Sequence, residues 1–117
     1  MSTPEGKVKK DLKKYLTEKN AWQLWAVPNG MGRSGVLDCQ VAYKSIFFSV
    51  ECKAPGRREE ENQGASALQV KEMKYIDRTG STGFLFDGEE DDWWALRKVI
   101  ERIDLGATIE GLGRKPY

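Results

Sequence analysis

The chain has 117 residues, enough for one domain with a single hydrophobic core, so we expect one domain over residues 1–117. It contains no histidine, which excludes Ser-His-Asp and Cys-His catalysis and makes oxygen-held Mg²⁺ or Mn²⁺ the expected kind of metal. The formal net charge is only +1, and neither a membrane-spanning apolar run nor an N-terminal leader is seen, so we expect a cytoplasmic protein with no membrane partner.

The first segment is predicted to be a helix from Pro4 to about Glu18, with Thr3 as its N-cap. Apolar residues recur at helical spacing and form the expected buried stripe: Val8, Leu12, Tyr15 and Leu16. Glu5 precedes this stripe by one turn and projects toward the same face, where it also complements the helix dipole. The other face is basic, and three of its lysines are candidates for phosphate contacts, although a solvated face is the commoner role: Lys7, Lys10 and Lys14.

A strand is predicted over residues 22–27, followed by a glycine-rich loop over residues 28–35. Glycine-rich loops that bind nucleotides precede a helix, whereas this one precedes a strand, so the pattern excludes a P-loop or a dinucleotide-binding loop. The loop is either a simple connector or a close approach to DNA, with Arg33 as a candidate phosphate ligand.

Residues 35–53 have the pattern of a β-hairpin with a turn at Lys44-Ser45. A two-residue loop predicts three apolar cross-strand pairs, Tyr43 with Ile46, Val41 with Phe48, and Cys39 with Val50. Alternation then gives one apolar face for the core: Leu37, Cys39, Val41, Tyr43, Ile46, Phe48, Val50 and Cys52.

The opposite face of this hairpin carries Asp38, Gln40, Ser49, Glu51 and Lys53. The register predicts that Asp38 faces Glu51, with Cβ atoms roughly 5 Å apart, which is unfavourable unless a cation lies between them. Lys53 reaches the same side and could orient a water molecule or stabilise a developing negative charge. On spacing alone, a solvated polar surface explains these residues equally well.

A polar loop over residues 57–64 follows and is expected to be mobile, with Arg57 and Arg58 as candidates for DNA-backbone contacts. Ser66 then opens a helix that runs to about Thr79 through a capping box with Gln69. Gln69 also points toward the sheet, near the end of the strand that carries Lys53, so a role as cap partner and a role in a site are both open.

A strand over residues 82–87 should lie parallel to the second hairpin strand, because a helix connects them in a right-handed crossover. A last helix is predicted over residues 92–103, with the preceding acidic residues as N-terminal charge rather than a second metal site. Trp94 lies outside the apolar stripe of this helix. It is either a dimer contact or simply a partly exposed tryptophan. The tail from Gly106 shows no predicted structure.

The order helix, three strands, helix, strand, helix indicates an α/β fold with a mixed central sheet flanked by helices. Within it the motif residues follow one another as Glu5, Gly35 to Asp38, Glu51-Cys52-Lys53 and Gln69. This pattern resembles the short, phage-type stand-alone VRR-NUC domains of the PD-(D/E)XK nuclease superfamily. Leu37 departs from the pattern, since the family commonly has proline before the aspartate.

The resemblance implies a restriction-endonuclease-like α-β-β-β-α-β core and a Mg²⁺- or Mn²⁺-dependent DNA endonuclease. The resemblance implies that the metal ligands are Asp38, Glu51 and the carbonyl of Cys52, with Glu5 in the outer shell. Lys53 orients the attacking water, and Gln69 positions Lys53 or the phosphate.

The resemblance further implies a homodimer that resolves Holliday junctions in phage replication, recombination and repair, in the cytoplasm of the host. Three alternatives stay open: a restriction-like nuclease, a flap- or nick-directed nuclease, and a non-enzymatic module that binds DNA or a protein partner.

Overall fold

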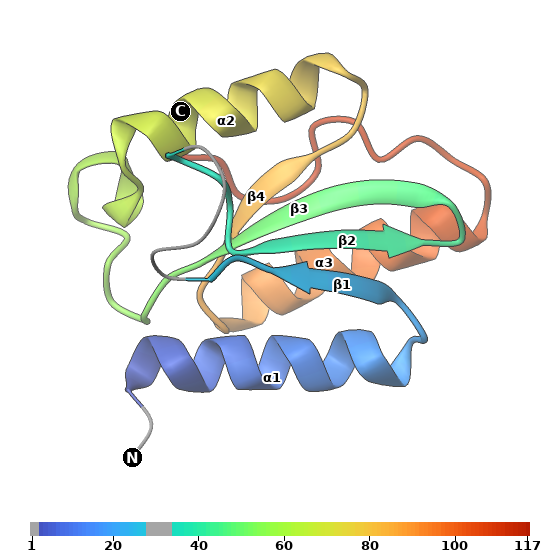
Figure 1. The fold of residues 1–117 in the computed structure, drawn as a ribbon, viewed down its shortest axis with the longest axis horizontal. Helices are drawn as coiled ribbons and strands as arrows, with labels where there is room; N and C mark the ends of the chain where they lie inside the picture. Colours follow the sequence, from blue (N-terminus) through green and yellow to red (C-terminus); the bar gives the residue numbers. More distant parts are fainter. Residues whose placement is uncertain (1–2, 28–33) are drawn as a thin grey trace.

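The computed structural model describes residues 3–27 and 34–117, which form a four-stranded mixed sheet flanked by helices. The strands lie in the order β1-β2-β3-β4, as Figure 1 shows. The elements are α1 (Pro4–Glu18), β1 (Trp22–Trp25), β2 (Cys39–Tyr43), β3 (Ile46–Cys52), the 3₁₀ helix η1 (Glu61–Gly64), α2 (Ala67–Arg78), β4 (Gly83–Phe86) and α3 (Glu90–Asp104). This order confirms the predicted fold class.

The hairpin of β2 and β3 has the predicted register, with Cys39 opposite Val50, Val41 opposite Phe48 and Tyr43 opposite Ile46. Its turn consists of Lys44 and Ser45, whose φ angles of 48° and 70° both lie in the left-handed region. A two-residue hairpin turn of this hand matches the twist of the strands, even though neither residue is the glycine or asparagine that such turns prefer. The pairing of β3 with β4 is parallel, as predicted.

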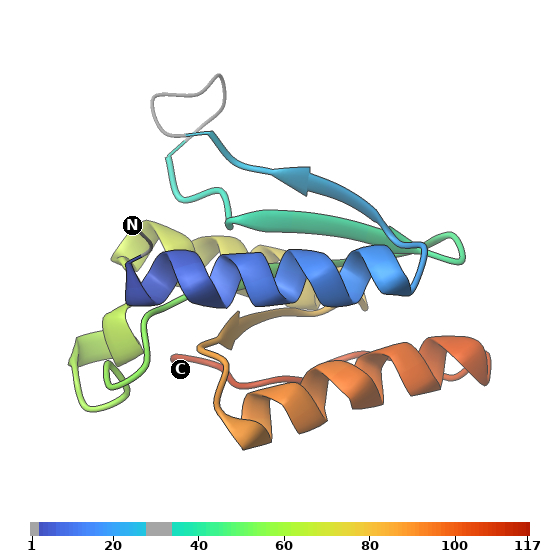
Figure 2. The same cartoon turned by 90° about the horizontal axis from the view of Figure 1, so that it is seen from below.

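Helices α1 and α3 cover one face of the sheet, and α2 covers the other. Figure 1 shows α1 and α2 on opposite sides of the sheet, and Figure 2 shows α1 and α3 lying side by side. The ring of Tyr15 meets that of Trp93 at 5.4 Å between centroids, which joins these two helices. The larger core therefore lies between the sheet and the α1–α3 layer.

A smaller core lies beneath α2 and contains Leu37, Ala65, Met73 and Leu85. The prediction that Leu37 shares a face with Cys39 is therefore wrong. Leu37 precedes the regular part of β2, where the alternation of side chains no longer applies. Ile46 is the other exception, since it is 42% exposed at the turn.

Three of the five residues on the polar face of the hairpin are buried, and the other two, Asp38 and Gln40, are half-buried. Glu51 is 3% exposed, Lys53 is 7% exposed, and Ser49 is fully buried. Because ionised side chains are rarely buried unless they are paired, their burial argues against the solvated-surface interpretation.

The segment after α3 is structured, contrary to the expectation for the tail. The backbone N–H of Leu85 donates a hydrogen bond to the carbonyl of Arg114 at 2.9 Å, so the tail pairs with β4. Ile109 is 4% exposed and packs in the larger core. The tail has too few apolar residues to give a periodic signal, which is why its sequence did not predict this arrangement. No helix in the described ranges is both long enough and apolar enough to cross a bilayer.

Candidate active site

Asp38 and Glu51 meet at the end of the hairpin, as the register predicts. The backbone N–H of Asp38 donates to Glu51 Oε1 at 3.1 Å, and the backbone N–H of Cys52 donates to Asp38 Oδ2 at 2.9 Å. Each carboxylate is thus held by the backbone of the strand opposite. Because both hydrogen bonds depend on strand pairing, the hairpin fixes the relative position of the two acids.

Lys53 and Gln69 complete this arrangement from the end of β3 and the first turn of α2. Lys53 Nζ lies 3.2 Å from Glu51 Oε2 and 3.2 Å from Gln69 Oε1. Gln69 Nε2 donates to the same Glu51 Oε2 at 2.9 Å. The three side chains therefore form a closed set of contacts, and the ammonium of Lys53 is held in one place.

Gln69 is the cap partner of α2, and its side chain also contacts Glu51 and Lys53. Its Oε1 accepts a hydrogen bond from the backbone N–H of Ser66 at 3.0 Å, and its own N–H donates to Ser66 Oγ at 3.1 Å, which is a complete capping box. The cap fixes the rotamer of Gln69, so the start of α2 also orients the amide that holds Glu51 and Lys53.

The environment of Glu51 is unfavourable for its charge. Burial, followed by the neighbouring charge of Asp38, raises the pKa of the Glu51 carboxyl to about 7, although Lys53 opposes the shift. An additional cation would stabilise the ionised forms of two neighbouring carboxylates that are partly removed from water.

Glu5 lies near this pair, with the side chain of Lys9 between them. Lys9 Nζ is 3.4 Å from Glu5 Oε2 and 3.6 Å from Asp38 Oδ1. Burial would lower the pKa of Lys9, but the charges of Asp38 and Glu5 outweigh it and raise that pKa. Lys9 was not predicted as a site residue, although its position one turn after Glu5 on the same helix face indicates a pair with that acid.

The residues present suit a hard divalent cation. Asp38 and Glu51 offer carboxylate oxygens, and the carbonyl of Cys52 adds a neutral oxygen of the kind that Mg²⁺ and Mn²⁺ accept. Within residues 3–27 and 34–117, no three side chains of acidic residues, histidine or cysteine converge as a metal site on their own. A metal held here would therefore need the backbone carbonyl of Cys52 and water molecules as further ligands, and Mg²⁺ commonly retains water.

The candidate DNA contacts are distributed unevenly around this site. Lys7, Lys10 and Lys14 are exposed on α1, and Lys7 Nζ pairs with Asp11 at 2.8 Å. Arg57 pairs with Glu60 at 2.8 Å. Arg33 lies outside the described residues.

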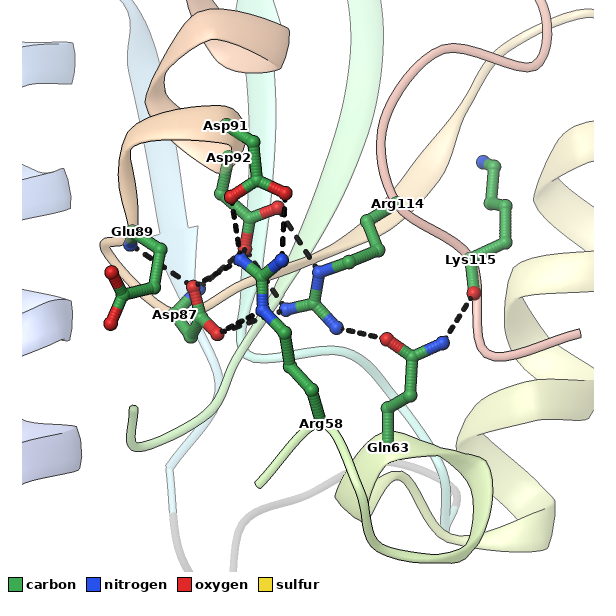
Figure 3. A network of polar contacts seen from close by, with 8 residues as sticks. All are labelled: Arg58, Gln63, Asp87, Glu89, Asp91, Asp92, Arg114 and Lys115. Atoms are coloured by element: carbon green, nitrogen blue, oxygen red, sulfur yellow. Dashed lines mark hydrogen bonds and ion pairs between the residues drawn. The ribbon is translucent and has the colours of Figure 1, made fainter. Parts of the chain in front are cut away.

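Arg58 is bound within an acidic network at the start of α3 (Figure 3). Its guanidinium donates to Asp87 at 2.8 and 3.0 Å and to Asp91 at 2.7 Å through each of two nitrogens. Arg114 donates to Asp92 at 3.1 and 2.9 Å. Asp87 and Asp92 are 1% and 2% exposed. A contact between Arg58 and DNA would require breaking these pairs, so Arg57 is the more available of the two arginines.

The same network attaches the loop over residues 57–64, which was expected to be mobile. Gln63 Nε2 donates to the carbonyl of Lys115 at 2.9 Å, and Gln63 also accepts a hydrogen bond from Arg114. The acidic residues before α3 thus do more than complement its dipole. Their partners come from distant parts of the chain, and no local pattern in the sequence indicates them.

Comparison with known proteins identifies the fold. No family model matches the sequence, and no match was found among the curated proteins. A solved structure described as a VRR_NUC domain is similar over 86% of this chain and 97% of that chain, with a TM-score of 0.62 and 24% sequence identity. The chain therefore has the fold of a VRR_NUC domain, in agreement with the resemblance drawn from the motif residues.

Proposed function

We propose that this chain is a metal-dependent DNA endonuclease of the VRR-NUC kind. The observation that carries the proposal is the set of buried Glu51 and Lys53 with half-buried Asp38 and Gln69, joined by hydrogen bonds and an ion pair on the fold of a VRR_NUC domain. A binding module has no need to hold two adjacent carboxylates beside a positioned ammonium, whereas phosphodiester hydrolysis uses each of these groups.

Asp38, Glu51 and the carbonyl of Cys52 would hold Mg²⁺ or Mn²⁺, with Glu5 in the outer shell. When bound, such an ion polarises the scissile phosphate and lowers the pKa of a water molecule. Lys53 donates hydrogen bonds that orient the attacking water and stabilise negative charge on the phosphate oxygens. Gln69 keeps the Lys53 ammonium in position, because its Oε1 accepts from Nζ at 3.2 Å while the capping box fixes the amide.

We further propose that the substrate is a four-way DNA junction and that the active form is a homodimer. The described residues contain one set of Asp38, Glu51 and Lys53, and resolution of a junction needs two symmetric cuts. The exposed lysines of α1 supply positive charge for the DNA backbone. Sedimentation at the concentrations used for cleavage tests the dimer separately from the chemistry, and a monomer under those conditions would contradict it.

Cleavage of labelled four-way junction, flap, nicked duplex, linear duplex and single-stranded DNA tests the activity, each with Mg²⁺, Mn²⁺ or EDTA. Lys53→Met keeps the length of the side chain and removes its charge, and we expect cleavage to fall at least about 100-fold because the charge stabilisation is lost. Lys71→Met is the matched control, since Lys71 is exposed on α2 and has no place in the mechanism.

Paired symmetric cuts that need the divalent ion and Lys53 would support the junction-resolving nuclease. Cuts confined to flaps, nicks or linear duplex would keep the nuclease and overturn the junction assignment. Binding of DNA without any cleavage, equal in wild type and Lys53→Met, would instead support the non-enzymatic binding module.

A further inference from the structure

Asp38 offers one oxygen that no described residue binds by a hydrogen bond. Its Oδ2 accepts from the N–H of Cys52, while both oxygens of Glu51 are already engaged by Asp38 N–H, Gln69 and Lys53. The remaining oxygen, Asp38 Oδ1, faces Lys9 Nζ at 3.6 Å. A divalent ion that binds Asp38 would therefore approach the oxygen that Lys9 now neutralises.

Lys9 is able to leave this position without disturbing the fold. Its side chain is 37% exposed, and its two ion pairs are long, at 3.4 Å to Glu5 and 3.6 Å to Asp38. The backbone of α1 is fixed by the buried Val8 and Leu12. The flexible four-carbon stem of lysine can move its ammonium while the helix stays in place.

We infer that Lys9 acts as an internal counter-cation: its ammonium neutralises Asp38 before metal binds and moves to the DNA backbone when metal binds. This inference rests on the proposed metal site. An ammonium and a divalent ion repel each other at one carboxylate, and the displaced ammonium needs a new anion. A DNA phosphate at the site supplies that anion, so metal and DNA would each strengthen the binding of the other.

The first test measures Mn²⁺ binding to the full chain without DNA, from the electron paramagnetic resonance signal of the free ion. Lys9→Met is expected to bind Mn²⁺ about 3- to 10-fold more tightly than wild type, because a partly solvated competing charge is removed. Lys9→Arg keeps the charge and should remain near wild type. Lys10→Met is the control on the same helix, since Lys10 is exposed and forms no ion pair with the described residues.

The second test repeats the titration with a four-way junction present and with cleavage blocked by Lys53→Met in every variant. DNA should tighten Mn²⁺ binding in the Lys53→Met parent. When Lys9→Met is added, the ratio of the Mn²⁺ affinities with and without DNA should fall by about the same 3- to 10-fold as in the first test. Equal Mn²⁺ affinity in wild type and Lys9→Met without DNA would overturn the inference.

Asp38→Asn separates this inference from the proposed function. If wild type binds Mn²⁺ and Asp38→Asn does not, the metal site stands, and the result for Lys9→Met decides the inference alone. If Asp38→Asn and wild type bind Mn²⁺ equally, or neither binds it, the metal site and the role of Lys9 are both overturned. Circular dichroism of each variant confirms that the fold is retained.

Discussion

Glu51 is the residue whose environment most constrains the chemistry. It is 3% exposed, lies beside Asp38, and has a pKa raised to about 7 by burial and by that neighbour. Lys53 and Gln69 limit the cost of this arrangement but do not remove it. A charged carboxylate in this environment lowers the free energy of unfolding, and a cation that binds to it in the folded state would raise it again.

The free energy of unfolding should therefore depend on pH through Glu51. In the unfolded chain the carboxyl has its ordinary pKa of about 4.3, whereas in the folded chain it is about 7. Between these values the unfolded state releases the proton first, so the folded protein loses about 2 to 3 kcal/mol of stability as pH rises from about 4.5 to 7. Urea unfolding in EDTA at pH 5 and pH 7.5 measures this loss.

Glu51→Gln is the matched control for this measurement, because the amide has a similar shape and does not titrate. Its stability should change less than that of wild type over the same range, since the chain has no histidine. The remaining change comes from Asp92, whose pKa is raised by burial. The pKa values of Asp91 and Asp104 are lowered by their basic partners, so these groups titrate below this window. An equal loss of stability in Glu51→Gln would show that another group is responsible.

The residues of the candidate site were predictable to different degrees. Alternation along two strands and the length of one turn were enough to place Asp38 opposite Glu51 and to put Lys53 on the same side. The capping box placed Gln69 at the start of α2. The spacing of Lys9 from Glu5 could have indicated their ion pair, but the contact of Lys9 with Asp38 depends on how α1 packs against the sheet, and no local pattern encodes that geometry.

At the scale of elements, the helices and strands were predicted well and the final segment was not. Caps and periodicity gave α1 from Pro4 to Glu18, as found. The tail was missed because it is held by polar contacts with distant segments. Lys115 Nζ, for example, donates to Asp77 at 2.8 Å and to the carbonyl of Gly83 at 2.6 Å.

Arg114 should be the main polar anchor of this tail. Its removal leaves the buried Asp92 with Arg58, at 3.4 Å, as its cation among the described residues and with the hydrogen bond from the N–H of Asp87. We therefore expect Arg114→Met to lower the free energy of unfolding by about 3 kcal/mol. Arg97→Met is the control, because the pair of Arg97 with Glu90 is exposed and should contribute less than about 0.5 kcal/mol. Urea unfolding at pH 7 compares the two, and similar small losses would mean that the tail is not anchored by this charge.

At the scale of the whole molecule, charge is distributed unevenly although the net charge is only +1. Exposed lysines line α1, the helix whose first turns carry Glu5 and Lys9 to the site. The acidic residues gather instead at the start of α3, where Arg58 and Arg114 neutralise much of their charge. A weak overall charge therefore coexists with a lysine-rich face on α1, which the net charge alone does not reveal.

This distribution predicts which lysines set the salt dependence of DNA binding. Replacing Lys7, Lys10 and Lys14 together by glutamine should lower the slope of log Kd against log salt by about 2 to 3, since each phosphate contact contributes roughly 0.9. Fluorescence anisotropy with a four-way junction between about 50 and 200 mM salt measures the slope. The matched variant replaces three basic residues of α3 by glutamine: Arg97, Lys98 and Arg102. Equal reductions in both variants would show that general charge, rather than the α1 face, governs binding.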